Sequence, residues 1–314
     1  MSSLDVVTFG ESMAMFVADR PGDLSVIDQF TKRMAGAETN VSVGLSRLGL
    51  KVGWVSRLGE DSFGRSIRNM LDREQVDCGC VAADPRYPTG FMLKSVAEKN
   101  ADPRVEYFRK GSAASRLSRA DFDSEYFLSA RHMHVTGIAP ALSDSCLDFT
   151  HHAMEFMRAA GRSISFDPNL RPSLWQSETV MINNINALAA KADWVLPGLA
   201  EGRRLTGLTE PHDIAGFYLD RGAKLVVIKL GPQGAYFRDA TQEAIIPGVP
   251  VQNVVDTVGA GDGFAVGVIS ALLEGLPVHS AVMRGNRIGA FAIQVIGDMD
   301  GLPTRAELDA AERL

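Results

Sequence analysis

The chain has 314 residues, 46% of them hydrophobic and 22% charged, which suits one large α/β domain and excludes a disordered protein. A formal net charge of −6 excludes a general attraction to nucleic acid or to anionic membranes. No stretch approaches the ~18 apolar residues of a membrane span, and the N-terminus lacks the basic and apolar segments of a secretory signal. Three cysteines cannot all pair with one another, so we expect a cytoplasmic protein with no nucleic-acid or membrane partner.

The first part of the chain predicts strands that alternate with helices. The apolar run VVTFG at residues 6–10 ends in glycine and is typical of a buried strand. Residues 40–49 have apolar side chains at helical spacing and stop at a glycine, which predicts a helix with a C-cap. A second strand is predicted at 51–59. The following helix, at 61–76, begins with an aspartate that suits the N-cap position.

The same alternation continues through the middle of the chain. Strands are predicted at 132–137, 163–168, 193–198 and 224–231. Helices are predicted between them at 146–161, 178–192 and 211–222. Strands that alternate with helices imply βαβ units, so we expect a doubly wound and mostly parallel sheet with helices on both faces.

Two segments, from about 14 to 35 and from 89 to 109, look like short strands without intervening helices. The second segment alternates around the polar turn EKNADP at residues 98–103, which predicts a hairpin. Antiparallel strands inserted into an α/β domain would form a lid at one edge of the site. Because the chain has no long linker or internal repeat, we expect one domain over residues 1–314, with the lid as part of it.

The segment DTVGAGDGFAVG at residues 256–267 concentrates glycines before an apolar run of helical length that ends at Gly275. Its glycines therefore lie at a helix N-terminus, where free N–H groups and the helix dipole can bind an anion. A carboxylate at Asp262 would repel a bound phosphate, but it could accept the proton of a hydroxyl that attacks a phosphoryl group. For the short string GAGD alone, an ordinary glycine turn with an aspartate N-cap is the favoured interpretation.

The complete twelve-residue string is more specific, and it resembles the second signature of the PfkB, or ribokinase-like, family of carbohydrate kinases. AGAETNVSVGLSRLG at residues 35–49, followed by Gly59, resembles the first signature. The resemblance covers essentially the whole chain. It implies a ribokinase-like α/β/α sandwich with a small β-sheet lid, and transfer of the ATP γ-phosphoryl group to a sugar. Asp262 would be the general base, and the residues implied for the anion hole are Gly259, Ala260 and Gly261.

The resemblance also implies which residues bind the sugar. Gly36 and Asn40 would contact its hydroxyls, although Asn40 could also cap the helix that it begins. Glu38 departs from the small residues that most of the family has there. GAETN resembles the branch of the family that phosphorylates 2-keto-3-deoxygluconate.

Two arginines point to a sugar acid. The segments around Tyr107 and Arg109, and around Arg171, resemble those that hold the carboxylate and keto end of the substrate in that branch. A guanidinium group matches a carboxylate in bidentate geometry, which a neutral sugar does not require. An ordinary surface arginine is the alternative at either position, and Met92 stands where some members have tyrosine. We expect conversion of 2-dehydro-3-deoxy-D-gluconate to its 6-phosphate.

Other functions stay open at this point. One alternative is a kinase for a neutral ketose such as fructose or tagatose, and another is a sensor of sugar or nucleotide without catalysis. The chain has neither a P-loop motif nor a G-x-G-x-x-G motif after its first strand, which argues against P-loop and dinucleotide-binding proteins. The histidines His132, His134, His151 and His152 are interpreted as structural.

The cofactors implied by the resemblance are ATP and Mg²⁺, with K⁺ left open. KLGPQGAYF at 229–237 resembles the nucleotide loop of the family, although alone it reads as a hairpin turn. Glu201 would bind Mg²⁺ through water, with Gly198 replacing the usual Asn. Asp256 and the Val258 carbonyl resemble the loop that often holds a monovalent cation, but Asp256 could equally brace the turn. The residues implied for the nucleotide are Lys229, Gly231, Gly234, Gly259, Gly261 and Asn286. Apart from these cofactors, the resemblance implies a homo-oligomer formed through the lid.

Overall fold

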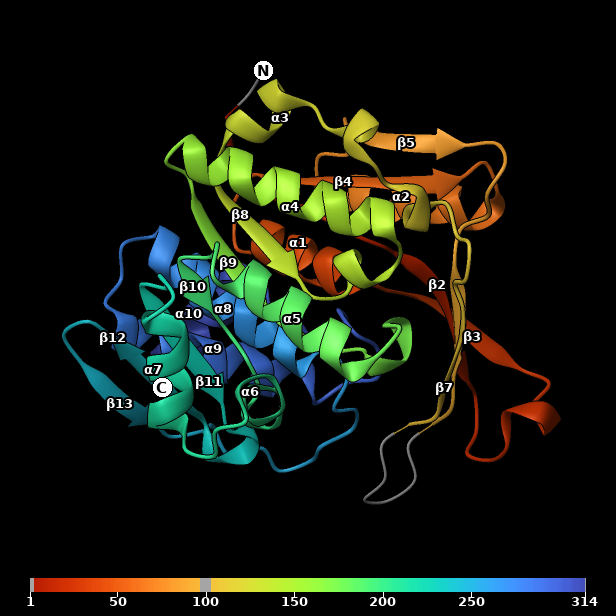
Figure 1. Cartoon of the computed structure of the whole chain (residues 1–314). Coiled ribbons are helices and arrows are strands. Elements are labelled where there is room, and N and C mark those ends of the chain that lie inside the picture. The colour runs from red at the N-terminus through yellow and green to blue at the C-terminus, as the bar shows by residue number, and fades with distance from the viewer. Residues whose placement is uncertain (1–2, 97–102, 314) are drawn as a thin grey trace.

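The computed structural model describes residues 3–96 and 103–313. A large sheet lies between two layers of helices, and a small sheet stands at one end of it (Figure 1). The large sheet has nine strands in the order β13-β12-β11-β10-β9-β8-β1-β4-β5. Their bounds are β1 (Leu4–Phe9), β4 (Val52–Gly59), β5 (Val81–Asp84), β8 (Ala130–Thr136), β9 (Ser163–Asp167), β10 (Trp194–Val195), β11 (Leu225–Lys229), β12 (Ala235–Asp239) and β13 (Glu243–Ile246).

The strands from β5 to β11 pair in parallel, as the alternation of strands and helices predicted. Two antiparallel strands, β12 and β13, extend the sheet at one edge. The turn between β11 and β12 contains the short 3-10 helix Gly231–Gln233, so the hairpin expected at KLGPQGAYF is present. A strand buried on both faces is apolar throughout, which explains runs such as LVVIK in β11.

Helices cover both faces of the sheet. Val6 and Val7 of β1 point to opposite faces and lie in different hydrophobic cores, because side chains alternate along a strand. One core contains the apolar sides of α4, α5 and α7, and the other contains those of α1, α8 and α9. The helices are α1 (Ala37–Arg47), α2 (Ser62–Arg73), α3 (Ser124–Leu128), α4 (Asp144–Ala159), α5 (Glu178–Ala189), α6 (Leu199–Thr206), α7 (Pro211–Leu219), α8 (Ala260–Leu273), α9 (Val278–Ala292) and α10 (Arg305–Glu312).

The predicted lid is a separate sheet of four strands, ordered β3-β2-β6-β7. The strands β6 and β7 form the expected antiparallel hairpin, while residues 98–102 of its turn lie outside the described residues. Methionines on one face of the lid form a small core, and phenylalanines cluster on the other, where Phe91 stacks on Phe108 at 4.6 Å. The lid strands are β2 (Met13–Ala18), β3 (Phe30–Ala35), β6 (Phe91–Lys94) and β7 (Val105–Phe108).

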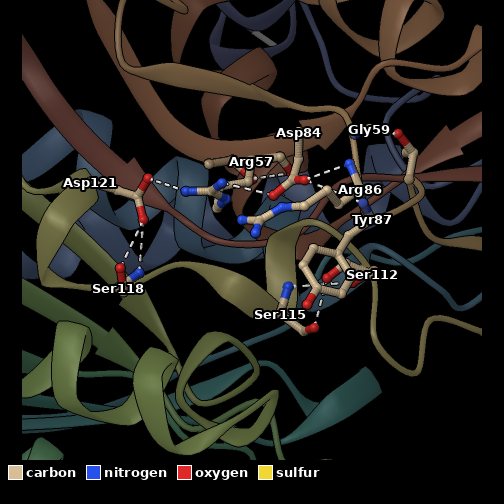
Figure 2. Close-up of polar contacts among 11 residues, drawn as sticks. Arg57, Gly59, Asp84, Arg86, Tyr87, Ser112, Ser115, Ser118 and Asp121 are labelled. Carbon is tan, nitrogen blue, oxygen red and sulfur yellow. Dashed lines mark hydrogen bonds and ion pairs between the residues drawn. The ribbon is translucent and has the colours of Figure 1, made fainter.

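A polar network joins β4 and β5 of the large sheet to the segment that leads into β6 and to the segment that follows β7 (Figure 2). Arg57, at the end of β4, donates to Asp84 at 2.7 Å and to Asp121 at 2.6 Å. The other Asp84 oxygen accepts the backbone N–H groups of Arg86 and Tyr87. Burial alone would raise the pKa of Asp84, but these hydrogen bonds hold it below its usual value. The segments before β6 and after β7 are therefore anchored at the base of the lid.

Within residues 3–96 and 103–313, no helix is both long and apolar enough to cross a bilayer. Each of the three cysteines is a free thiol. His132 and His134 are buried in β8 and bond to serines of β9, which agrees with the structural role expected for them.

Candidate active site

A cavity of about 400 Å³ lies between the lid and the carboxyl ends of the parallel strands. This is the edge of an open α/β sheet where ligands bind, because the loops that follow the strands diverge there. The lid contributes Met13, Met92 and Tyr107, while Asp167 and Asn169 follow β9. Of the residues predicted for the site, those that line the cavity are Gly36, Asn40, Tyr107, Arg109, Arg171, Glu201, Lys229, Val258, Gly259, Gly261 and Asp262.

The N-terminus of α8 opens into this cavity. Gly259 is its N-cap with φ +86°, and a Cβ there would lie 2.4 Å from the Asp298 carbonyl oxygen, so the position requires glycine. The Lys229 Nζ lies next to the first turn, 3.6 Å from the position of a Cβ on Gly261. The first N–H groups of a helix have no intrahelical partner. The helix dipole and the ammonium group are therefore suited to binding an anion.

Asp262 lies in the first turn of α8 and lines the cavity, and its side chain makes no capping hydrogen bond to the helix. It accepts a 2.7 Å hydrogen bond from the Asn40 amide and a longer one, 3.4 Å, from Asn169. Burial raises its pKa to about 7, and the charges of Asp167 and Asp298 act in the same direction against the Asn40 hydrogen bond. A carboxyl group with a near-neutral pKa beside an anion site is suited to proton transfer. It does not cap the helix, as the alternative interpretation required.

Asn40 also has a role different from helix capping. The N-cap of α1 is Gly36, and Asn40 lies inside the helix with its side chain directed at Asp262. Gly36 has φ +153°, and a Cβ there would lie 2.5 Å from the Glu11 carbonyl oxygen. The first signature therefore turns the chain tightly and places a hydrogen-bond donor beside the proposed base.

Arg109 is already paired inside the cavity wall. Its Nε donates to Glu11 at 2.6 Å, and its Nη2 lies 2.5 Å from the same oxygen. The other Glu11 oxygen accepts from Ser112, and Tyr107 lies against the guanidinium at 5.6 Å from the ring centroid. Glu11 was not identified from the sequence, although it directly follows the first strand. Its charge compensates that of Arg109 before any ligand binds.

Arg171 has no carboxylate partner in the part of the chain that the structure describes. Its Nη1 donates to the side-chain and main-chain oxygens of Asn169 and to the Leu170 carbonyl. Asn169 has φ 37°, a left-handed conformation that is uncommon outside glycine. This turn aims Arg171 into the cavity with its charge uncompensated, since only neutral oxygens contact it.

Glu38, noted from the sequence as a departure, is buried in the cavity wall. One carboxylate oxygen accepts from Thr136 at 2.5 Å, and the other has no hydrogen-bond partner among the described residues. Burial raises its pKa to about 7, against the Thr136 hydrogen bond. A Cβ on Gly10 would lie 2.3 Å from this carboxyl group, so glycine makes room for it. Glu38 therefore presents to the cavity a carboxyl group whose neutral form is favoured by burial.

The cavity also contains carboxylates that fit a hydrated Mg²⁺. Both oxygens of Glu201 accept backbone N–H groups at 2.7 Å, from Leu170 and from Gly198. Asp167 pairs with Lys229 at 2.6 Å. No group of three or more His, Cys, Asp or Glu within 3–96 and 103–313 could hold a metal by itself. This suits Mg²⁺, which keeps several waters and binds through one or two carboxylates together with substrate phosphates.

Three residues predicted for the nucleotide lie outside the cavity lining: Gly231 and Gly234 in the turn between β11 and β12, and Asn286 in α9. Asn286 of α9 donates to the carbonyls of Ile246 and Pro247 at 3.1 and 3.0 Å. Gly234 has φ +100°, and a Cβ there would lie 2.0 Å from the Ile246 carbonyl. Gly231 also has a positive φ, +61°. Asn286 and Gly234 therefore both pack against the backbone at the end of β13, at Ile246 and Pro247. Their contact with a nucleotide stays a prediction.

Asp256, predicted to bind a monovalent cation or to brace its turn, makes two kinds of contact. Its Oδ1 accepts the N–H of Val258 at 3.1 Å, which braces the turn. Its Oδ2 lies 2.6 Å from the Nζ of Lys94, a buried lysine of the lid. In this chain the carboxylate therefore contacts a lysine ammonium.

Comparison with known proteins agrees with this geometry. Residues 3–305 match the profile described as pfkB family carbohydrate kinase. The chain belongs to the pfkB family of carbohydrate kinases. This pfkB kinase is 54% identical over 306 residues to a 2-dehydro-3-deoxygluconokinase of Bacillus subtilis, covering 97% of this chain and 94% of that protein. A 2-dehydro-3-deoxygluconokinase of Thermoproteus tenax is 32% identical, covering 98% of this chain and 93% of that protein. Fructokinase-1 of rice is more distant, at 30% identity over 96% of each chain.

Solved structures confirm the ribokinase-like fold. A PfkB protein from Polaromonas sp. JS666 superposes with a TM-score of 0.91 at 55% identity, covering 98% of this pfkB kinase and 100% of that chain. A putative ribokinase II from E. coli, solved in complex with ATP and Mg²⁺, has a TM-score of 0.91 at 26% identity over 99% and 100% of the two chains. ATP and Mg²⁺ are therefore ligands within this fold.

Proposed function

We propose that this protein is an ATP-dependent kinase that converts 2-dehydro-3-deoxy-D-gluconate to its 6-phosphate. The observation that supports a sugar acid is Arg171, a guanidinium in the cavity whose hydrogen bonds within residues 3–96 and 103–313 all go to neutral oxygens. A substrate carboxylate would supply its missing charge in bidentate geometry. The two relatives named 2-dehydro-3-deoxygluconokinase support the same substrate.

The residues at α8 suit phosphoryl transfer to a hydroxyl. Asp262, held by Asn40, would accept the proton of the attacking hydroxyl. The α8 N-terminus at Gly259, Ala260 and Gly261, together with Lys229, would stabilise the charge on the phosphoryl oxygens. Mg²⁺, when bound beside Glu201, supplies further positive charge to the phosphates of ATP.

The remaining residues divide between the sugar and the nucleotide. Gly36 and Asn40 would contact sugar hydroxyls, and Tyr107, Arg109 and Arg171 would hold the acid end beneath the lid. Arg109 would bind through Nη1, because Glu11 occupies its other edge. Burial of the substrate under the lid excludes water from the phosphoryl group.

Three further properties belong to the same proposal. The chain forms one domain over residues 1–314, because the anchored lid closes a cavity whose other wall is the large sheet. It acts as a homo-oligomer formed through the lid, whose edge strand β7 carries exposed aromatic side chains. Its free thiols suit a reducing compartment, the cytoplasm.

A substrate comparison tests this function. The kcat/KM for 2-dehydro-3-deoxygluconate and for fructose is measured with wild type, Arg171→Ala and, as a matched control, the exposed helix residue Arg73→Ala. Arg171→Ala is expected to lower kcat/KM for the acid about 10- to 100-fold, because a charge-assisted hydrogen bond contributes about 1.5–3 kcal/mol. The activity of Arg171→Ala on fructose should equal that of wild type. Arg73→Ala should equal wild type on both sugars.

Three outcomes contradict the proposal in different ways. A wild type that prefers fructose indicates a ketose kinase. Equal losses on both sugars for Arg171→Ala remove the arginine from recognition of the acid. Absence of ATP consumption with every sugar supports a sensor.

A further inference from the structure

Lys94 is a buried lysine with two carboxylate partners. It ends the lid strand β6, and its side chain is only 2% exposed. Its Nζ lies 2.6 Å from Asp256 and 3.1 Å from Asp298. Asp256 precedes α8, and Asp298 follows α9. One ammonium group therefore joins the lid to two loops beside the proposed anion site.

Both partners of Lys94 hold the turn that begins α8. Asp256 accepts the Val258 N–H at 3.1 Å. The backbone carbonyl of Asp298 packs so closely on Gly259 that a Cβ there would lie 2.4 Å away. Displacement of either aspartate would therefore move Val258 or Gly259, and with them the N–H groups that face the phosphoryl position.

The two carboxylates need a cation between them. Both are buried, and burial of a charge is costly unless an opposite charge compensates it. Burial raises the pKa of Asp298, the Asp256 charge adds to this, and Lys94 opposes it. Two other carboxylates interact electrostatically with Asp298, namely Asp262 and Asp300, and Asp300 is itself paired with Arg33. Removing the ammonium would leave two carboxylates in mutual repulsion beside Gly259.

We propose that the Lys94 ammonium is a built-in monovalent cation, a positioning residue that orders the anion-binding turn and couples it to the lid. The enzyme then requires no free monovalent cation for phosphoryl transfer. This inference rests on the proposed role of the α8 N-terminus, but not on the identity of the sugar.

Cation rescue of Lys94→Ala tests the proposal. The kcat is measured on whichever sugar is phosphorylated, in chloride salts of choline, Li⁺, K⁺ and NH₄⁺ at equal ionic strength. Wild type is expected to show the same kcat in all four salts. Lys94→Ala should lose about tenfold or more in choline, because it leaves buried charges uncompensated, and should recover most of this loss in K⁺ or NH₄⁺. Lys32→Ala, a lid lysine that bonds only to Ser66 among the described residues, is the control that should behave as wild type.

The outcomes separate a positioning role from a merely structural one. Lys94→Gln, which keeps a polar side chain one atom shorter than lysine and without its charge, replaces the alanine variant if that variant does not fold. A loss of kcat in Lys94→Ala that is equal in all four salts overturns the proposal. Such a loss would indicate a packing defect, because a packing defect does not depend on which cation is present. Activation of the wild type by K⁺ also overturns it, while leaving the kinase function intact.

Discussion

At the residue scale, the cavity contains two carboxyl groups, Asp262 and Glu38, whose pKa burial raises to about 7. A raised pKa in the folded protein means that the neutral form is favoured. Each group therefore contributes stability below the pKa of the unfolded chain, and that contribution is lost as the pH rises through about 7. Above neutral pH the free enzyme holds buried negative charge beside its anion site. This cost is consistent with a carboxylate kept for proton transfer.

Asp262→Asn is expected to stabilise the free protein at alkaline pH and to abolish most of its activity. Asparagine can still accept the Asn40 hydrogen bond but never ionises. At about pH 8 the free energy of unfolding of the variant should exceed that of wild type by on the order of 2–4 kcal/mol. At about pH 4 the two free energies of unfolding should be equal. The kcat should fall by on the order of 10²–10⁴-fold. Urea unfolding at both pH values and steady-state kinetics measure these effects.

The exposed helix residue Asp72 provides the control for this experiment. Asp72→Asn should change neither the pH dependence of stability nor kcat. If Asp262→Asn retains near-normal turnover, Asp262 is not the base. If its stability differs from wild type by the same amount at both pH values, the Asp262 pKa is not raised.

At the element scale, the two glycines of the α8 N-terminus have different reasons to be glycine. Gly259 cannot accept a side chain, because its φ is positive and the Asp298 carbonyl lies against it. Gly261 lies inside the helix, and a Cβ there would make only an ordinary 3.6 Å contact with the Lys229 Nζ. The fold therefore tolerates alanine at Gly261. An alanine methyl group at this position would lie beside the Lys229 ammonium group. A phosphoryl group bound to the α8 N-terminus would occupy the same space.

Gly261→Ala should accordingly separate stability from activity. Alanine is favoured over glycine inside a helix by roughly 0.5–1 kcal/mol, so the variant should be as stable as wild type or more stable. Its kcat should fall by about tenfold or more, because the methyl group displaces the phosphoryl oxygens from the N–H groups. Thermal unfolding and steady-state kinetics on the same preparation test both statements.

Gly216→Ala, at a half-buried position of α7 where a Cβ would meet only the Nη1 end of the Arg238 side chain at 3.3 Å, is the matched substitution away from the cavity. It should preserve kcat. A Gly261→Ala protein that is fully active contradicts the anion site, and one that loses stability and activity together indicates a structural glycine.

At the scale of the whole molecule, local patterns predicted the large sheet, and contacts between distant segments could not be predicted. The alternation of strands and helices was sufficient for the parallel strands of the core, because short strand-like runs that end at glycine or proline lie between segments with apolar residues at helical spacing. The short strand β5 and the edge strand β13 have no such run and were missed. The Arg109–Glu11 pair spans 98 positions and the Lys94–Asp256 pair spans 162, so neither pair leaves a local signal. Motif resemblance found Asp262, but its raised pKa depends on burial that only the fold supplies.

The lid also presents a surface to other molecules. Its edge strand β7 carries Tyr107 and Phe108, which are 46% and 48% exposed. An edge strand offers unpaired backbone groups, and exposed aromatic side chains beside them favour pairing with a second chain. Tyr107 faces the cavity, so pairing of two lids would also restrict the entrance to both cavities. A homodimer through β7 would thus link assembly to the closure of the site.

Phe108→Asp should convert this dimer to a monomer, because a buried and unpaired carboxylate would replace an apolar contact at the interface. Sedimentation velocity should give wild type twice the mass of one chain and the variant the mass of a single chain. The control is Ile245→Asp, an exposed apolar position on β13, the edge strand of the large sheet at the end away from β5 (Figure 1). That variant should stay dimeric. A wild type that sediments as a monomer contradicts assembly through the lid, and a Phe108→Asp protein that remains dimeric places the interface elsewhere.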